Sequence, residues 1–175
     1  MQSIAETILR KVGTLRRNRP RVLVAIDGRS AAGKTSLAAL LRESCGCNVI
    51  HMDEFFLRPE QRTTQRLAQP GENVDHERFA DEVLIPLARG EQFSYRPYDC
   101  KTQAFGPPIR VTPHPVTVVE GAYSCHPKLA DSYDLTIFLS TDPQEQARRI
   151  LKRNGEIGAA AFADCAKRTR RASSS

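Results

Sequence analysis

The chain has 175 residues, of which 40% are hydrophobic and 26% are charged. At ~100–200 residues per domain, this length predicts one domain over residues 1–175, with a core large enough to fold without disulfides. No apolar run approaches the ~18 residues that a membrane span requires. The first residues include Glu6 and lack the apolar segment of a secretion signal. We therefore expect a cytoplasmic protein without a membrane partner.

The net charge limits the classes of partner, and the cysteines indicate whether disulfides or a zinc site are expected. A net charge of +6 suits nucleic acid, but equally a polyanionic small molecule such as a nucleoside triphosphate. Basic residues cluster at 16–21 and 167–171, but no aromatic residues alternate with them as in surfaces that stack bases. The absence of such aromatic residues argues against nucleic acid as a partner. The five cysteines lack a matching histidine cluster, so we expect reduced thiols rather than disulfides or a zinc site.

Hydrophobic periodicity predicts alternating helices and buried strands. Within residues 1–19, apolar side chains at helical spacing predict an N-terminal helix that Pro20 terminates. Short continuous apolar runs predict strands buried on both faces at residues 22–26, 48–51, 116–119 and 135–139. Further helices are expected after the first strand to about residue 44, over residues 75–90, and from Pro143 to about residue 154.

Three segments depart from this alternation. Residues 57–73 are polar and aperiodic, which predicts a lid-like loop, and residues 93–113 mix prolines and glycines with short apolar pieces, which predicts a β-hairpin excursion. Residues 155–175 form an atypical tail, rich first in alanine and then in basic residues. Outside these segments, the alternation of buried strands and helices predicts an α/β fold, in which a mostly parallel sheet has helices on both faces. In such sheets ligands bind outside the carboxyl ends of the strands.

The strongest motif follows the first predicted strand. Residues 28–35 match G-x-x-x-x-G-K-[ST] in full, with a strand before and a helix after, which predicts a phosphate-binding loop for ATP. Lys34 would neutralise the β- and γ-phosphates, and the Thr35 hydroxyl would face Mg²⁺. The expected nucleotide-binding residues are Gly28, Ser30, Ala31, Ala32, Gly33, Lys34, Thr35 and Ser36.

Two carboxylates follow other predicted strands. No guanine-reading N-K-x-D motif is present, so a small kinase, in which a carboxylate activates an acceptor hydroxyl, fits best. Asp53, just past the second strand, suits that role beside Lys34, with Glu54 or a turn-capping role for Asp53 as the alternatives. Glu120 ends the third strand, where a carboxylate beside a phosphate loop would hold Mg²⁺ or its water; a structural role for Glu120 stays open.

The segments DGRSAAGKTS, HMDEFF, VDHERF, YRPYD and VVEGAY together resemble one family. They occur in the same order and at similar spacing as in the uridine–cytidine kinase branch of the uridine kinase/phosphoribulokinase family of P-loop kinases. The similarity covers roughly residues 20–154. It implies a P-loop NTPase-type sheet, ATP and Mg²⁺ as cofactors, and a nucleoside as the acceptor.

The resemblance assigns roles to individual residues. It implies that Asp53 is the catalytic base and, with Thr35 and Glu120, serves Mg²⁺. It implies that Asp75 grips the ribose hydroxyls, that Tyr98 lies near the base, and that Arg149, with its arginine neighbours 148 and 153, belongs to a lid over the phosphates. Each substrate contact has a plainer alternative: Asp75 as a helix N-cap, Tyr98 as a cover over the core, and the arginines as a solvated helix face.

Some positions depart from the family pattern, so the acceptor stays open. Gln103 lies near the place of the family's base-reading histidine, Phe56 replaces a tyrosine, and Glu77 stands where the family has proline. A uridine- or cytidine-like nucleoside is the expected acceptor. The alternatives are a pantothenate- or sugar-like metabolite, or a non-catalytic nucleotide-binding regulatory protein. A homo-oligomer is compatible with the sequence.

Overall fold

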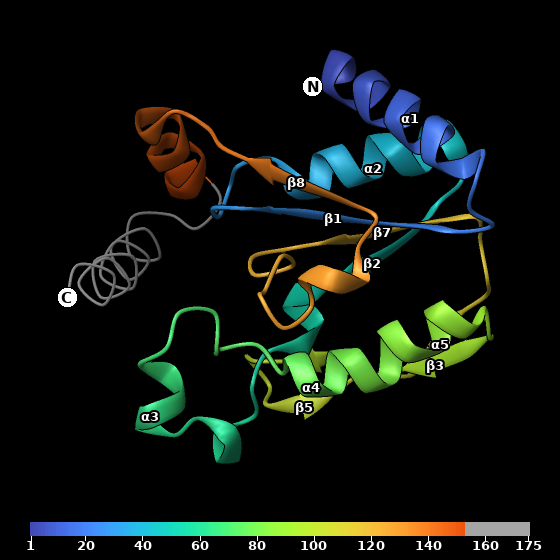
Figure 1. Cartoon of the computed structure of the whole chain (residues 1–175). Coiled ribbons are helices and arrows are strands. Elements are labelled where there is room, and N and C mark those ends of the chain that lie inside the picture. The colour runs from blue at the N-terminus through green and yellow to red at the C-terminus, as the bar shows by residue number, and fades with distance from the viewer. Residues whose placement is uncertain (153–175) are drawn as a thin grey trace.

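The centre of the molecule is a parallel four-stranded sheet (Figure 1). The computed structural model describes residues 1–152. The strand order is β2-β7-β1-β8, so the first strand in the chain lies inside the sheet. The bounds are Val22–Gly28 for β1, Asn48–His51 for β2, Val116–Glu120 for β7 and Leu135–Leu139 for β8. All four predicted strands are confirmed, and β1 and β7 extend to the residues that carry the motifs.

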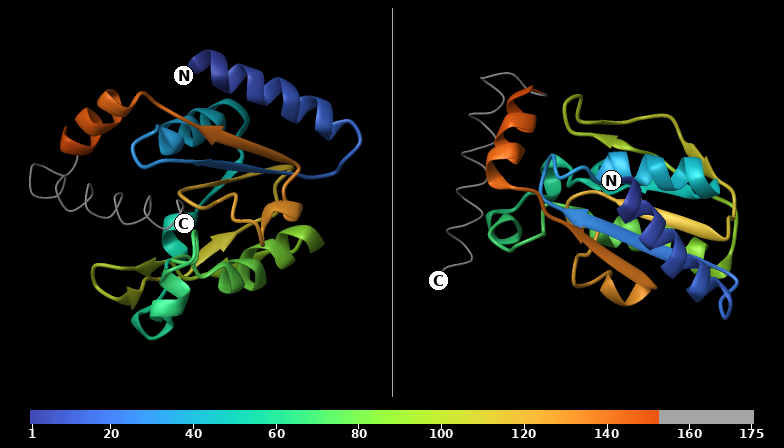
Figure 2. Two further views of the ribbon diagram at one scale, coloured as in Figure 1. Left: turned by 60° about the vertical axis from the view of Figure 1, so that its left-hand side comes forward. Right: turned by 90° about the horizontal axis from the view of Figure 1, so that it is seen from above.

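Helices cover both faces of this sheet (Figures 1 and 2). On one face lie α1 (Gln2–Arg16) and α2 (Lys34–Cys45). On the other lies a continuous helical stretch made of α4 (His76–Phe79), a π-helical segment (Ala80–Leu84) and α5 (Ile85–Arg89). The stretch ends at Gly90, in the left-handed region at φ 70°. The predicted P-loop NTPase-type architecture with helices on both faces is therefore observed.

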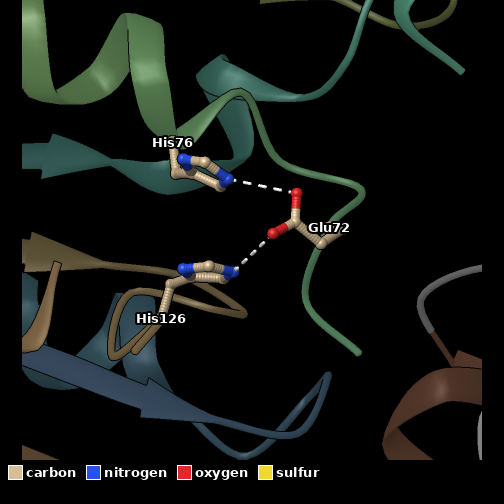
Figure 3. Close-up of side chains that lie close together, drawn as sticks. All are labelled: Glu72, His76 and His126. Atoms are coloured by element: carbon tan, nitrogen blue, oxygen red, sulfur yellow. Dashed lines mark hydrogen bonds and ion pairs between the residues drawn. The ribbon is translucent and has the colours of Figure 1, made fainter. Parts of the chain in front are cut away.

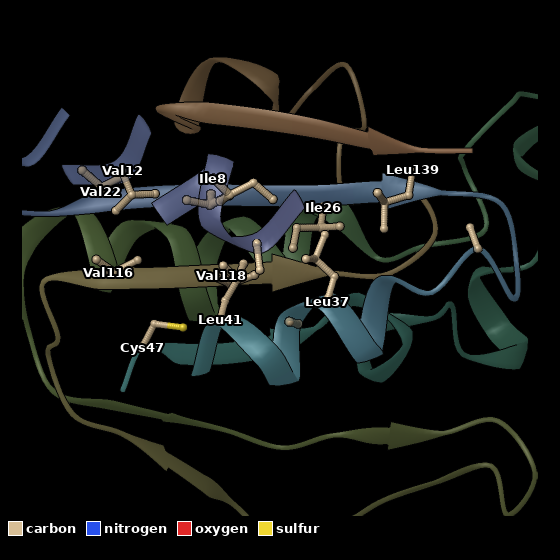
Figure 4. Close-up of a cluster of buried hydrophobic side chains, with 14 residues drawn as sticks. Ile8, Val12, Val22, Ile26, Leu37, Leu41, Cys47, Val116, Val118 and Leu139 are labelled. Atoms are coloured by element: carbon tan, nitrogen blue, oxygen red, sulfur yellow. The ribbon is translucent and has the colours of Figure 1, made fainter. Parts of the chain in front are cut away.

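Each face of the sheet has its own hydrophobic core. Figure 4 shows the core that packs α1 and α2 against the sheet; its largest contributors include Ile8, Val24, Ile26, Leu37 and Leu41. The second core lies under α4 and α5, where Phe55 and Phe79 meet edge to face with ring centroids 4.9 Å apart. Because β7 is buried at every position, its side chains contribute to both cores.

The segment after α5 forms the antiparallel excursion that the sequence predicts. In it β3 (Phe93–Tyr95) pairs with β6 (Ile109–Val111), and β4 (Tyr98–Asp99) pairs with β5 (Ala104–Phe105).

The polar segment at 57–73 has more helical structure than the sequence predicts. It holds a 3₁₀ turn (Pro59–Gln61) and the short helix α3 (Thr64–Leu67), whose N-cap Thr63 accepts from the Arg66 backbone N–H. Further 3₁₀ turns span Met52–Phe55 and Ala130–Ser132. These turns are too short to show a hydrophobic period, which is why the sequence indicates only a loop.

Residues 143–152 are helical, as expected. Arg153 and the tail at 155–175 lie outside the described residues. Within residues 1–152, no helix is both long enough and apolar enough to cross a membrane.

Candidate active site

The predicted phosphate-binding loop is the turn between β1 and α2, and three of its residues have positive φ angles. Gly28, Ala31 and Gly33 have φ values of 143°, 60° and 97°. A Cβ atom on Gly28 would lie 2.2 Å from the carbonyl oxygen of Leu139, so this position excludes any side chain. Gly28 is therefore required where the loop lies against the end of β8, and Gly33 is favoured by its positive φ angle.

Lys34 and Thr35 begin α2 at the carboxyl edge of the sheet. The Lys34 Nζ donates to the carbonyl oxygens of Gly28, at 2.8 Å, and Arg29, at 3.0 Å, and the side chain is largely buried. The Thr35 hydroxyl donates to Oε1 of Glu120 at 3.1 Å. The motif's lysine and hydroxyl thus lie over the loop and next to the carboxylate that ends β7.

Glu120 joins two strand ends. Glu120 pairs with His51 in the register of β2 and β7, and His51 Nδ1 lies 2.6 Å from Glu120 Oε1. This hydrogen bond raises the pKa of His51 above its ordinary value. Glu120 is 4% exposed, and its carboxylate contacts Thr35 and His51. Sequence reasoning missed His51, although its place at the end of β2 was a usable signal.

Asp53 and Glu54 point in different directions from the 3₁₀ turn after β2. Asp53 lines the cavity beside the phosphate loop. A Cβ atom on Gly121 would lie 2.8 Å from Met52 Cβ and 3.2 Å from Asp53 Oδ1, so the glycine after Glu120 lets the turn that carries Asp53 pack closely against β7. Glu54 instead accepts a hydrogen bond of 2.6 Å from the Tyr95 hydroxyl in the β3 strand. Adjacent carboxylates therefore have separate surroundings, and Asp53 is the one at the cavity.

A cavity of about 600 Å³ collects these groups at the carboxyl edge of the sheet. Its wall holds the loop, a buried lysine, a hydroxyl and two carboxylates. These are the donor types that bind phosphates and a hard cation such as Mg²⁺. The lining residues are Met1, Ser30, Ala31, Gly33, Lys34, Thr35, Ser36, Asp53, Phe56, Glu120, Ala122 and Arg149.

The helix at 143–152 contacts the phosphate loop directly. Arg149 Nη1 donates to the Ala31 carbonyl oxygen at 3.3 Å, and its Nε donates to Glu145 at 2.7 Å. Gln146 Nε2 donates to the Ser30 carbonyl oxygen at 2.9 Å, a contact that sequence reasoning did not foresee. Arg148 is exposed and pairs with Glu145. Of Arg148 and Arg149, only Arg149 lines the cavity.

Asp75 and Tyr98 do not line this cavity. Asp75 is buried, and its Oδ1 caps α4 by accepting from the Arg78 backbone N–H at 3.1 Å, while Gln61 Nε2 donates to its Oδ2 at 2.8 Å. Tyr98 is also buried, and its hydroxyl has no hydrogen-bond partner among residues 1–152. Gln103 is exposed at the turn between β4 and β5, with φ 52°.

Asp27 connects the phosphate loop to the loop after β7. Its Oδ1 accepts from the backbone N–H groups of Gly28, at 2.6 Å, and Tyr123, at 3.1 Å, and its Oδ2 accepts from that of Cys125 at 2.9 Å. One carboxylate thereby holds the two loops that flank the cavity in a common position.

Comparison with known proteins agrees with the motifs. No protein-family model matches the chain. Over 141 residues it is 26% identical to proteins named uridine kinase from two strains of Chloroflexus aurantiacus, a match that covers 76% of this chain and 68% of each relative. The structure of a possible uridine kinase from Bacillus stearothermophilus matches with a TM-score of 0.61 at 18% identity, over 80% of this chain and 85% of that one. The resemblance to uridine kinase-like P-loop kinases is confirmed, as is the α/β fold.

Proposed function

We propose that the protein is an ATP-dependent small-molecule kinase that transfers a phosphoryl group to a hydroxyl of a nucleoside. One observation carries the proposal: a single cavity brings together the phosphate loop, Lys34 and the carboxylates of Asp53 and Glu120. The similarity to proteins named uridine kinase supports the same class of reaction.

The proposed roles follow from where each side chain lies. The loop amides and Lys34 bind the ATP phosphates, and Lys34 exchanges its two carbonyl partners for phosphate oxygens. Thr35, Glu120 and Asp53 are the residues that would hold Mg²⁺, whose charge, when it is bound, offsets that of the phosphates. His51 orients Glu120 through the 2.6 Å contact. Arg149 adds positive charge at the cavity wall.

Asp53 is the proposed general base. Phosphoryl transfer depends mainly on positioning and on electrostatic stabilisation of the transferred group, so the base has one limited task. It accepts the proton of the acceptor hydroxyl as that oxygen forms its bond to phosphorus and the bond to the leaving ADP oxygen breaks. Glu54 is tied to the Tyr95 hydroxyl and has no part in this step.

A second acceptor class is favoured by one specific observation. The two residues expected to contact a nucleoside, Asp75 and Tyr98, are buried outside the cavity wall. An acceptor such as a sugar-like or pantothenate-like alcohol would need neither residue and could bind through the residues that line the cavity.

The test is a panel of acceptors assayed for ATP-dependent formation of ADP and of the phosphorylated product. Uridine, cytidine and 2′-deoxyuridine represent nucleosides, while gluconate, ribose and pantothenate represent the second class. We expect turnover of ribonucleosides that is absent in Lys34→Ala. Turnover of only the second group would move the assignment to that class. If no alcohol were phosphorylated while ATP still bound, the protein would be a nucleotide-binding regulator rather than a kinase.

A further inference from the structure

A second group of chemically active side chains lies outside the proposed kinase site. Glu72 precedes α4, His76 lies in its first turn, and His126 lies in the loop after β7 (Figure 3). All three are buried, with exposed fractions of 7%, 4% and 5%. Glu72 and His76 are four residues apart, and only the fold brings His126 to them. Imidazole with carboxylate is a donor set that suits transition metals.

The three side chains lie close enough together for one metal ion to reach all of them. One ligand atom from each lies within 4.8 Å of the other two. Glu72 Oε2 is 3.1 Å from His76 Nε2, and Glu72 Oε1 is 3.7 Å from His126 Nε2. At the usual zinc–nitrogen and zinc–oxygen distances of ~2.0–2.1 Å, two ligand atoms on a tetrahedral ion lie about 3.3–3.4 Å apart. Closing the site around an ion therefore requires the Glu72 carboxylate to turn and the two imidazole rings, which are stacked with centroids 4.6 Å apart, to converge.

The surroundings prepare His76 and Glu72 to act as ligands. His76 Nε2 lies 3.1 Å from Glu72 Oε2 and 3.2 Å from Lys128 Nζ, and its Nδ1 lies 3.3 Å from a carboxylate oxygen of Glu77. A metal ion bound at Nε2 would place the ring proton on Nδ1, where Glu77 can accept it. Such a carboxylate behind the histidine is the common outer partner of metal-bound imidazole. Burial alone would raise the pKa of Glu72, but hydrogen bonds from Lys128 and His76 outweigh it and lower this pKa. Burial lowers the pKa of His126, which favours its neutral form.

Lys128 holds the place where an ion would sit. Its Nζ lies 2.9 Å from Glu72 Oε1 and 3.2 Å from His76 Nε2, so the ammonium bridges two prospective ligands. The Lys128 side chain is 59% exposed and can withdraw into water. Arg66, 3.3 Å from Glu72, remains as the partner of both Glu72 and Glu77. With Lys128 withdrawn, the two carboxylates outnumber the remaining cation, which favours a divalent ion.

Metal binding by His126 requires its ring proton to move from Nε2 to Nδ1. Its Nδ1 accepts from the Lys128 backbone N–H at 3.2 Å, so in this arrangement the proton of the neutral ring is on Nε2. A metal on Nε2 requires the proton on Nδ1, and therefore requires the Lys128 amide to move away. The third ligand therefore needs a backbone shift at Lys128 in addition to the withdrawal of its side chain.

We propose that Glu72, His76 and His126 form a binding site for Zn²⁺ or a similar transition-metal ion, with the fourth position, left by Lys128, taken by water. Three protein ligands and one open position are a common zinc arrangement. The ion would tie the segment before α4 to the loop after β7, and would thereby stabilise the part of the fold that contains Asp75. This inference does not depend on the proposed kinase activity.

The experiment is a calorimetric titration of the metal-free protein with ZnCl₂. We expect one equivalent to bind, a rise in melting temperature, and at least a tenfold loss of affinity in His126→Gln and in His76→Gln, because each variant removes a ligand. His51→Asn, which alters the other histidine–carboxylate pair, should bind zinc like the wild type. Co²⁺ should give a visible spectrum without thiolate-to-metal charge transfer, since no cysteine takes part.

Lys128→Met separates a metal site from a purely ionic cluster and should fold, because Lys128 is exposed. If the site binds metal, this variant binds Zn²⁺ more tightly than the wild type, since no ammonium competes. If Lys128→Met binds no zinc and melts at a lower temperature, Lys128 is the cation that the cluster requires and the proposal is overturned. Zinc affinity unchanged in both histidine variants would overturn it as well.

Discussion

Gln61 donates from Nε2 to Oδ2 of Asp75 at 2.8 Å, so a residue of the polar segment before α4 occupies the carboxylate that the family resemblance assigns to the acceptor. The other oxygen, Oδ1, caps α4. If acceptor hydroxyls bind to Asp75, they must displace Gln61, and the two residues should then have opposite effects on acceptor binding.

Gln61→Ala should lower the KM of a ribonucleoside several-fold, because it removes the competing donor, whereas Asp75→Asn should raise it. The Asp75 substitution loses charge-assisted hydrogen bonds worth ~1.5–3 kcal/mol, equivalent to roughly ten- to a hundredfold in KM. Both are measured by steady-state kinetics, with melting temperature as the control. Asn retains the capping oxygen, but its NH₂ group would face the Gln61 Nε2 donor, so some stability should be lost and the melting temperature measures how much. Unchanged KM in both variants would show that Asp75 serves only as a helix cap.

Asp53→Asn should lower kcat by about 10²–10⁴-fold, the usual contribution of a general base, while the KM of the acceptor changes only a few-fold. The matched control is Glu54→Gln, because Glu54 is the neighbouring carboxylate and faces Tyr95 rather than the cavity. It should cost less than tenfold in kcat, with some stability lost through the weaker bond to the Tyr95 hydroxyl. The reverse order of effects in the two variants would identify Glu54 as the base.

Lys34→Ala should abolish turnover and weaken ATP binding while leaving the far-ultraviolet circular dichroism unchanged. In the structure the lysine donates to the carbonyls of Gly28 and Arg29, and both carbonyls can turn to water when it is removed. Fluorescent ATP-analogue binding measures the effect. Wild-type affinity in this variant would exclude residues 28–35 as the phosphate site.

Asp27→Ala should lower the free energy of unfolding by about 1–3 kcal/mol, because three backbone N–H groups lose their common acceptor. Urea denaturation measures this. Asp27→Asn retains one acceptor oxygen and should lose less. Equal stability of the alanine variant and the wild type would show that the loop after β7 does not depend on this carboxylate.

Cys47 should resist alkylation between pH 7 and pH 9. Burial and the neighbouring Cys45 raise the pKa of its thiol to about 12, and the thiolate is the nucleophile. A raised pKa means that the thiol stays protonated through this range, so the little reaction that occurs should increase about tenfold per pH unit up to about pH 12. Cys100 is exposed and is the control within the same sample. Mass spectrometry after timed iodoacetamide treatment resolves the two sites, and equal rates would contradict the prediction.

The sequence by itself determined the sheet and the phosphate loop. Strand runs such as residues 22–26 and 116–119 are apolar or nearly so throughout, which is typical of a strand buried on both faces, and they are strands in the structure. The loop motif is recognisable because its glycines are required locally by backbone conformation. Asp53 and Glu120 each follow or end a predicted strand, and the carboxyl ends of parallel strands share one edge of the sheet, so their common location is predictable as well.

Only the tertiary structure decided which side chains meet. His51 reaches Glu120 because the register of β2 and β7 pairs them, and Gln61 reaches Asp75 because the polar segment folds back on α4. Glu72 and His76 lie four residues apart, but His126 joins them only where the loop after β7 returns to α4. Hydrophobic periodicity reports which face of an element is buried. It carries no information on which polar groups from distant elements share the buried space, because that depends on strand register and loop path.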